Sequence, residues 1–225
     1  ITNSAQVAAQ LQSAYGADQG LFRVIHTAVD SERFRPAQDR AALREKVCQQ
    51  LRTDPSRPVF LFVSLSHRRK GLDVLLDIWP EVDADLWIVG KTPDLRHRRR
   101  IKQLGIGNRI RCIAAQSNLT ALYQTADWFL HPTLYDACAN TVLQSMACGL
   151  PGLISANDGA IDLLRDGANG FLLRQPRDPG AVLDGVRRAM RPNTKMVYVE
   201  SPSNPAMQVT DIAAVAEIAH EHGAL

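Results

Sequence analysis

Apolar residues occur along this chain in short continuous runs, separated by segments in which they recur every three or four positions. Short runs bounded by turn residues predict buried strands, and the segments with helical spacing predict helices. Regular alternation of the two indicates βα units around a parallel sheet. We therefore expect a doubly wound α/β domain. The predicted strands are Leu21–Val29, Val59–Leu65, Ala84–Gly90, Arg109–Ala115, Asp127–Thr133, Gly152–Ala156 and Gly170–Gln175.

Two loops that follow predicted strands carry residues suited to an anionic ligand. In doubly wound folds, ligands bind where the carboxyl ends of strands meet helix N-termini, because free N–H groups and the helix dipole point there. The first loop, SHRRKG, places Arg69 and Lys70 directly before Gly71, which we expect to open the next helix. Two cations at such a position favour phosphate binding. The alternative for a basic dipeptide alone is a solvated pair of charges.

The second loop leads into a predicted helix with Asn140 as its N-cap and Gly149 followed by Pro151 as its stop. Its apolar residues have helical spacing, which predicts one buried face. Asp136 precedes the positive end of this helix, where an anion could rest on the N–H groups of residues 140–142. The face away from the core carries Thr141, Gln144 and Cys148.

Three of these polar residues have ordinary structural explanations. Asp136 taken alone is typical of a turn, and Gln144 taken alone is typical of a helix surface. Their eight-residue spacing favours ligand contact for both. His131 ends a predicted strand before Pro132, and a structural role and a site role are both open for it.

Composition and charge exclude several classes of protein. The 225 residues are 45% hydrophobic and 22% charged, as in ordinary globular domains. A net charge of +3 is too small for the concentrated positive field of a nucleic-acid-binding protein, so we expect no nucleic-acid partner. The four cysteines have no metal-ligand spacing and predict reduced thiols in a cytoplasmic protein, without a metal site. The phosphate-binding patterns GxxxxGK[ST] and GxGxxG are both absent.

A basic run, Arg96–Arg100 with Lys102, lies on a predicted helix. It could contact anionic lipid headgroups, which would suit a cytoplasmic protein that associates peripherally with the inner membrane. A solvated outer helix face is the more ordinary explanation.

The ordered series of motifs resembles the C-terminal, nucleotide-sugar-binding domain of retaining GT-B glycosyltransferases. It comprises NSAQVAAQLQSAYG, RVIHTAVDSERFRP, RRKGLDVLL, LWIVGK, LTALYQTADWFLHPTLYDACANTVLQSMACGLPGL and IDLLRDGANGFLL. The resemblance covers residues 1–190 and is strongest to the type that builds the lipopolysaccharide core. It implies a Rossmann-like domain and retaining, metal-independent transfer of a hexose. The implied donor is a nucleotide sugar, preferably a UDP-sugar, and the implied acceptor is a saccharide or glycolipid.

The resemblance also implies roles for individual residues. Arg69 and Lys70 match the basic pair that holds the donor's diphosphate. The backbone at the start of the later helix matches the segment that touches phosphate and sugar, which here is Asn140, Thr141 and Val142. Gln116 falls where residues near the nucleobase are found. No organic cofactor is implied.

Asp136 and Gln144 match the two ends of the family's E-x7-E pattern. The first acid of that pattern meets hydroxyls of the transferred sugar, so the resemblance implies a catalytic role for Asp136 beside Arg69 and Lys70. The second acid binds the ribose. This chain has D-x7-Q instead, which shortens the first acid and replaces the second by a neutral amide.

The two ends of the chain depart from that family. The family's N-terminal acceptor domain would precede Ile1, so we expect the chain to be a fragment. Residues 191–225, which contain ESPSNP, resemble the pyridoxal-phosphate enzymes of cysteine and methionine metabolism. The Schiff-base lysine of those enzymes would fall beyond Leu225, so we expect no pyridoxal phosphate. We therefore predict a joined chain, with residues 191–225 adding one βα unit; the alternative is a loosely packed tail.

Two classes of function compete at this point. A glycosyltransferase domain is favoured by the motifs. A non-catalytic nucleotide-binding module or chimeric scaffold is favoured by the expected loss of the acceptor domain. A pyridoxal-phosphate lyase is a distant third.

Overall fold

A single parallel sheet organises the computed structural model, which describes residues 1–189. Within those residues its six strands lie in the order β3-β2-β1-β4-β5-β6. The order reverses between β1 and β4, which creates the crevice where doubly wound folds bind ligands. The predicted Rossmann-like α/β class is confirmed. The strands are β1 (Val59–Ser64), β2 (Asp85–Gly90), β3 (Ile110–Ala114), β4 (Trp128–His131), β5 (Gly152–Ser155) and β6 (Gly170–Leu173).

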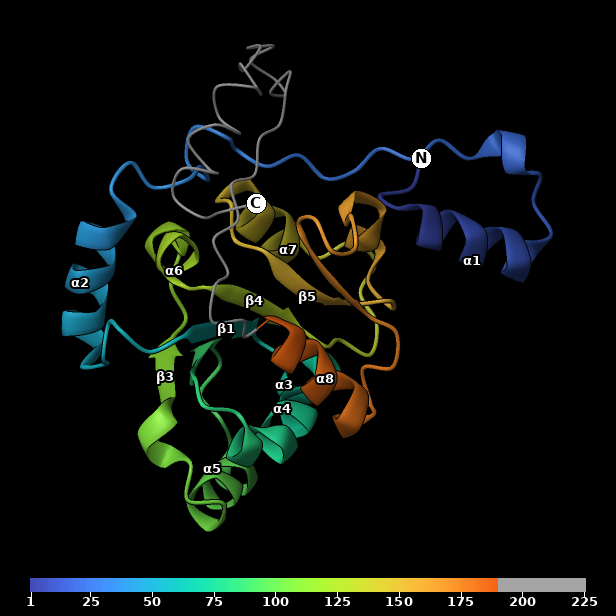
Figure 1. Cartoon of the computed structure of the whole chain (residues 1–225). Coiled ribbons are helices and arrows are strands. Elements are labelled where there is room, and N and C mark those ends of the chain that lie inside the picture. Colours follow the sequence, from blue (N-terminus) through green and yellow to red (C-terminus); the bar gives the residue numbers. More distant parts are fainter. Residues whose placement is uncertain (190–225) are drawn as a thin grey trace. The chain divides into compact units, whose positions relative to one another are not determined.

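Helices cover both faces of the sheet. Figure 1 shows α2, α6 and α7 on one side of the strands and α4 and α5 on the other. Short 3-10 turns follow or link several elements. The α-helices are α1 (Ala5–Tyr15), α2 (Arg40–Leu51), α3 (His67–Lys70), α4 (Leu72–Ile78), α5 (Leu95–Gln103), α6 (Thr120–Thr125), α7 (Asn140–Ala147) and α8 (Pro179–Ala189). The 3-10 turns are η1 (Gln19–Leu21), η2 (Trp79–Glu81), η3 (Gly107–Arg109) and η4 (Gly159–Leu163).

Strand β1 shows why its sequence is a continuous apolar run. Leu61 belongs to the buried cluster that also contains Phe129 of β4 and Val142 of α7. Its neighbour Phe60 points to the other face and packs edge-on against Trp79, with ring centroids 5.8 Å apart. A strand buried on both faces needs apolar side chains at successive positions rather than at alternate ones.

The strand predicted at Leu21–Val29 is wrong. This segment begins at the last residue of the turn η1 and contains one isolated bridge, between Thr2 and Val24. The Thr2 N–H donates to the Arg23 carbonyl at 2.9 Å, and the Ile25 N–H donates to the Thr2 carbonyl at 2.8 Å. Its apolar side chains are not buried, since Leu21 is 75% exposed and Ile25 is 55% exposed. The apolar residues of this segment were therefore not sufficient to place it in the sheet.

Some sequence predictions fall outside the described residues. These are the domain boundary at residue 190, the additional βα unit and the pyridoxal-phosphate-type segment 191–225. Among the helices of residues 1–189, none combines the length and the hydropathy that a bilayer span requires.

Candidate functional site

A pocket of about 400 Å³ opens at the carboxyl ends of β1, β2 and β3. Its apolar wall includes Val63 of β1, Val89 of β2 and Leu119 before α6. This is the edge of the sheet at which the sequence predicted a ligand. Four of the predicted site residues line the pocket, namely Arg69, Lys70, Gln116 and Thr141.

The loop between β1 and α4 presses closely against the segment that follows β4. Arg69 and Lys70 lie in the single turn of α3, and Gly71 then opens α4 as expected, with φ at 87°. A Cβ atom on Gly71 would collide with the carbonyl oxygen of Pro132. The Leu134 N–H donates to the Arg69 carbonyl at 2.8 Å. This contact between two chain segments brings the basic pair beside the second predicted loop.

Asp136 joins the two predicted loops. Lys70 Nζ and Arg69 Nη1 both donate to Asp136 Oδ2, the latter at 3.1 Å, and Arg69 Nη1 also donates to the Tyr135 carbonyl at 2.9 Å. Burial alone would raise the pKa of Asp136, but the hydrogen bond and charge of Lys70 outweigh it and hold that pKa below its ordinary value. Both cations thus converge on one carboxylate oxygen.

Behind this pair lies a fully buried histidine and carboxylate. His131 Nε2 lies 2.9 Å from Asp158 Oδ2 and 3.2 Å from Lys70 Nζ. Burial lowers the pKa of His131, although Asp158 opposes the shift, so the imidazole is neutral near pH 7. Asp158 Oδ1 accepts from the N–H groups of Ala139 and Ala160, at 3.1 and 2.8 Å. His131, for which the sequence left a structural role and a site role open, is therefore a fully buried residue that contacts the site cation Lys70.

Asp158 was missed by the sequence analysis. It lies in the turn after β5, in ANDGA, where an aspartate is an ordinary turn residue. Its importance comes from the backbone bridge between Asp136 and Asp158, which brings two distant loops together. A local pattern in one sequence does not contain that contact.

His131, Asp136 and Asp158 also form a group that could offer ligand atoms to a metal ion. One atom from each lies within 4.8 Å of the others. Lys70 Nζ contacts two of the three residues, so a metal ion would have to displace an ammonium group. The arrangement suits an internal ion pair better than a cation site.

The start of α7 differs from the prediction in detail. The N-cap is Ala139 without a side-chain capping bond, and Asn140 is instead the first helical residue. The Ala139 N–H is bound by Asp158, so a distant carboxylate fixes this helix start. The expected stop is confirmed, because Gly149 has φ at 75° after the last turn. Cys148 was wrongly placed on the outer face, since it is buried, and burial raises the pKa of its thiol to about 11.

Gln144 lies apart from the predicted basic pair. Its Oε1 accepts from the Tyr123 hydroxyl at 3.3 Å, and it does not line the pocket. Asp136 does not line the pocket either, but it forms ion pairs with Arg69 and Lys70, which do line it. The eight-residue spacing therefore corresponds to two residues with different surroundings.

The basic run on α5 is partly neutralised by α4. Arg96 pairs with Asp73, and Arg100 pairs with Asp77 at 3.0 Å. Arg98 and Arg99 are exposed. Much of this run therefore serves the contact between two helices.

Comparison with known proteins agrees with this architecture. Residues 57–191, more than half of the chain, match the family described as Glycosyl transferases group 1. D-inositol 3-phosphate glycosyltransferase 2 of Catenulispora acidiphila is 29% identical over 203 residues, which cover 80% of this chain and 45% of that protein. The GDP-mannose-dependent alpha-mannosyltransferase of Corynebacterium glutamicum is 29% identical over 160 residues, covering 69% and 37%. The chain thus spans less than half the length of these relatives.

A solved structure shows the same fold. The Anabaena protein HepE, crystallised in complex with UDP, superimposes with a TM-score of 0.74 at 21% sequence identity. The match covers 84% of this chain and 52% of that one.

Proposed function

Because this chain belongs to the group 1 family of glycosyl transferases, we propose that its 400 Å³ pocket binds the nucleoside diphosphate part of a sugar donor. The observation that carries the proposal is the position of Arg69 and Lys70. Among the residues that line this pocket, Arg69 and Lys70 are the two with cationic side chains, and they lie at the carboxyl ends of β1 and β2. Cations held at this edge of a doubly wound sheet suit a diphosphate.

In this proposal the diphosphate takes the place of Asp136 as the partner of the two cations. Arg69 and Lys70 exchange one carboxylate oxygen for phosphate oxygens, so neither cation becomes unpaired. The N–H groups of Asn140 and Thr141 at the start of α7 add donors from the positive end of a helix dipole, whereas the Val142 N–H already donates to the Ala139 carbonyl at 2.9 Å. The released Asp136 carboxylate can then accept hydrogen bonds from hydroxyls of the transferred sugar.

The remaining roles follow from the motif resemblance. Gln116 lines the pocket beyond β3, and we assign it to the nucleobase. We assign Gln144 to the ribose, which requires its amide to leave the Tyr123 hydroxyl. Since an amide has one acceptor oxygen and no charge, this contact is weaker than that of a carboxylate.

We further propose that transfer retains the configuration of the sugar and needs no metal ion. Arg69 and Lys70 would neutralise the charge that develops on the leaving diphosphate, which is the task a metal ion performs elsewhere. The acceptor in this proposal is a saccharide or lipopolysaccharide. A glycolipid acceptor would place the exposed Arg98 and Arg99 close to an anionic membrane.

Calorimetric titration of the full chain with UDP, GDP and ADP in the presence of EDTA tests this function. We expect binding that depends on Arg69 and Lys70, with UDP bound most tightly and uridine bound far more weakly than UDP. The weaker uridine binding would reflect the loss of charge-assisted bonds to phosphate. Absence of binding by all three nucleotides, or equal binding of uridine and UDP, would refute a diphosphate site.

A further inference from the structure

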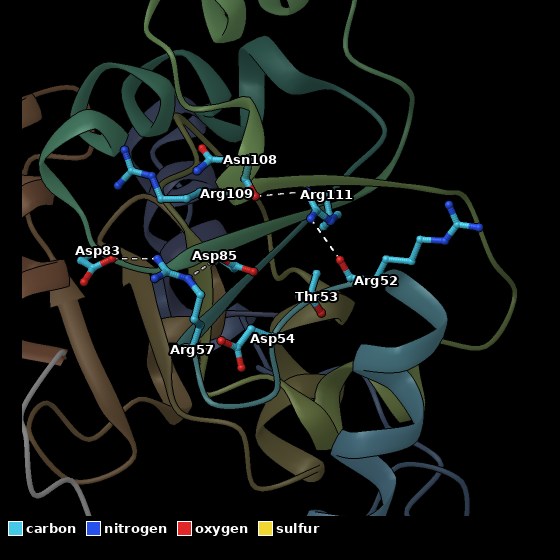
Figure 2. Close-up of a pocket in the computed structure, with 9 residues that line it drawn as sticks. All are labelled: Arg52, Thr53, Asp54, Arg57, Asp83, Asp85, Asn108, Arg109 and Arg111. Carbon is cyan, nitrogen blue, oxygen red and sulfur yellow. Dashed lines mark hydrogen bonds and ion pairs between the residues drawn. The ribbon is translucent and has the colours of Figure 1, made fainter.

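A second pocket of about 370 Å³ lies at the opposite ends of the same strands. Its lining comes from the segment after α2, the start of β2, and the turn that leads into β3. Figure 2 shows nine residues around it, four of them arginines and three of them aspartates. Because it borders the amino ends of the strands, it shares no lining residue with the pocket that contains Arg69 and Lys70.

The three carboxylates of this second pocket already have partners. Arg57 Nη2 donates to Asp83 at 2.7 Å, and Arg57 Nε donates to Asp85 at 3.0 Å. Asp54 accepts from the N–H and hydroxyl groups of Ser56, at 2.8 and 2.7 Å. These contacts lower the pKa values of Asp54 and Asp83, so both carboxylates are charged and engaged.

The other three arginines have no carboxylate within ion-pair distance among the described residues. Arg111 Nη1 donates to the Asn108 and Ile110 carbonyls at 3.2 and 3.1 Å, and its Nη2 donates to the Arg52 carbonyl at 3.1 Å. Arg109 donates to the Val82 carbonyl. Carbonyl bonds fix these guanidinium groups without neutralising them, and each guanidinium has five N–H donors. Two fixed cations are therefore left with unused donors.

Arg52 adds a third cation at a cost in backbone energy. It ends α2 with φ at 54° and ψ at 49°, the left-handed conformation in which glycine is usual at this position. Among residues 1–189 it is the only non-glycine residue with positive φ. In Figure 2 its side chain extends to one side of the pocket, while Arg109 lies toward the other. A strained residue with an exposed side chain suggests a functional constraint.

We propose that this pocket is an anion site for a small ligand that carries two phosphate groups. The lining charge is +1, from four arginines and three aspartates, and the surplus lies in Arg52, Arg109 and Arg111. Separated guanidinium groups suit two phosphates better than one, because each can bind a different group through paired N–H donors. The Thr53 hydroxyl, buried without a hydrogen-bond partner in the described part of the chain, supplies one more polar contact.

Inorganic pyrophosphate is the probe, titrated calorimetrically into the full chain. The variant Arg69→Ala/Lys70→Ala serves as the background, so that binding at the first pocket does not contribute. We expect one remaining site, at which inorganic phosphate binds at least tenfold more weakly than pyrophosphate. Absence of pyrophosphate binding in this background would overturn the proposal, whatever the outcome of the UDP titrations.

Arg52→Gly is the decisive variant, because it removes the charge and relieves the backbone strain together. We expect the midpoint of thermal unfolding to rise by a few degrees, while pyrophosphate affinity falls about tenfold, the lower end for loss of a charged hydrogen bond. Arg109→Gln should lower the affinity to a similar extent. Arg99→Ala, which makes the same change in charge on the exposed face of α5, should leave it unchanged. Unchanged affinity in Arg52→Gly and Arg109→Gln, or an equal loss in Arg99→Ala, would overturn the proposal.

Discussion

Lys70 is the residue on which the candidate donor site depends most. Its side chain is 11% exposed and lies between the Asp136 carboxylate and the neutral His131 ring. A nearly buried ammonium group without a counter-charge would cost several kcal/mol, and Asp136 supplies that counter-charge in the absence of ligand. In the proposed function a diphosphate replaces Asp136 and supplies negative charge to the same two cations. Under that proposal, Arg69 and Lys70 are held in position by Asp136 before the diphosphate binds.

The neutral state of His131 predicts that stability depends on pH. Burial holds the pKa of His131 below its ordinary value of 6.5, and the same holds for His67. The unfolded chain therefore takes up protons first as pH falls, and the stabilisation present above pH 6.5 is lost as pH drops through the folded-state values. We expect the unfolding midpoint to decrease steadily from pH 7 to pH 5.

His131→Asn tests the origin of that dependence. The variant should be less stable at pH 7, because a fully buried ring nitrogen within hydrogen-bond reach of Asp158 and Lys70 is lost, but its unfolding midpoint should fall less between pH 7 and pH 5. Thermal unfolding followed by circular dichroism at several pH values measures both effects. An equally steep decrease in wild type and variant would show that His131 does not titrate in this range.

At the scale of elements, the junction of α3 and α4 at Gly71 sets the position of the basic pair. We predict that Gly71→Ala destabilises the protein by about 2–5 kcal/mol. About 1–2 kcal/mol of this comes from the left-handed backbone, and the rest comes from overpacking against the Pro132 carbonyl. Urea unfolding measures the loss, and UDP affinity should fall with it because Arg69 and Lys70 must shift.

Gly105→Ala is the matched control for this prediction. Gly105 also has positive φ, at 68°, but a Cβ there would meet no heavy atom within 4 Å. We expect only the backbone cost, about 1–2 kcal/mol, and unchanged UDP affinity. Equal destabilisation by the two substitutions would mean that the close approach to Pro132 has no energetic role.

The elements show which sequence signals were sufficient. Strands buried on both faces, such as Val59–Ser64, were predicted because nearly every position is apolar. The segment Leu21–Val29 is also rich in apolar residues, but among the described residues it forms one bridge, to Thr2. Whether a neighbouring strand is available to pair with a segment cannot be seen in the sequence of that segment alone. Asn140 was predicted as an N-cap from its residue type, whereas the helix start is fixed by Asp158 from a distant turn. Sequence patterns thus located the basic pair and Asp136, and missed the tertiary contacts behind them.

At the scale of the whole molecule, the two ends of one parallel sheet differ in chemistry. The carboxyl ends of β1–β3 border a largely apolar pocket with two cations, and the amino ends border a pocket lined mostly by charged residues. The first arrangement suits a nucleotide, whose base is apolar and whose phosphates are charged. The chain spans less than half the length of the relatives reported above.

The most direct test of the central claim is UDP affinity, measured by calorimetry in EDTA, for wild type, Arg69→Ala/Lys70→Ala and Arg68→Ala. Arg68 is an exposed neighbour in α3 and makes the matched control. We predict that the double variant loses about 1.5–3 kcal/mol of binding free energy for each charged hydrogen bond removed, while Arg68→Ala binds like wild type. Undiminished UDP binding by the double variant, or binding that disappears in EDTA, would contradict a metal-free diphosphate site at Arg69 and Lys70.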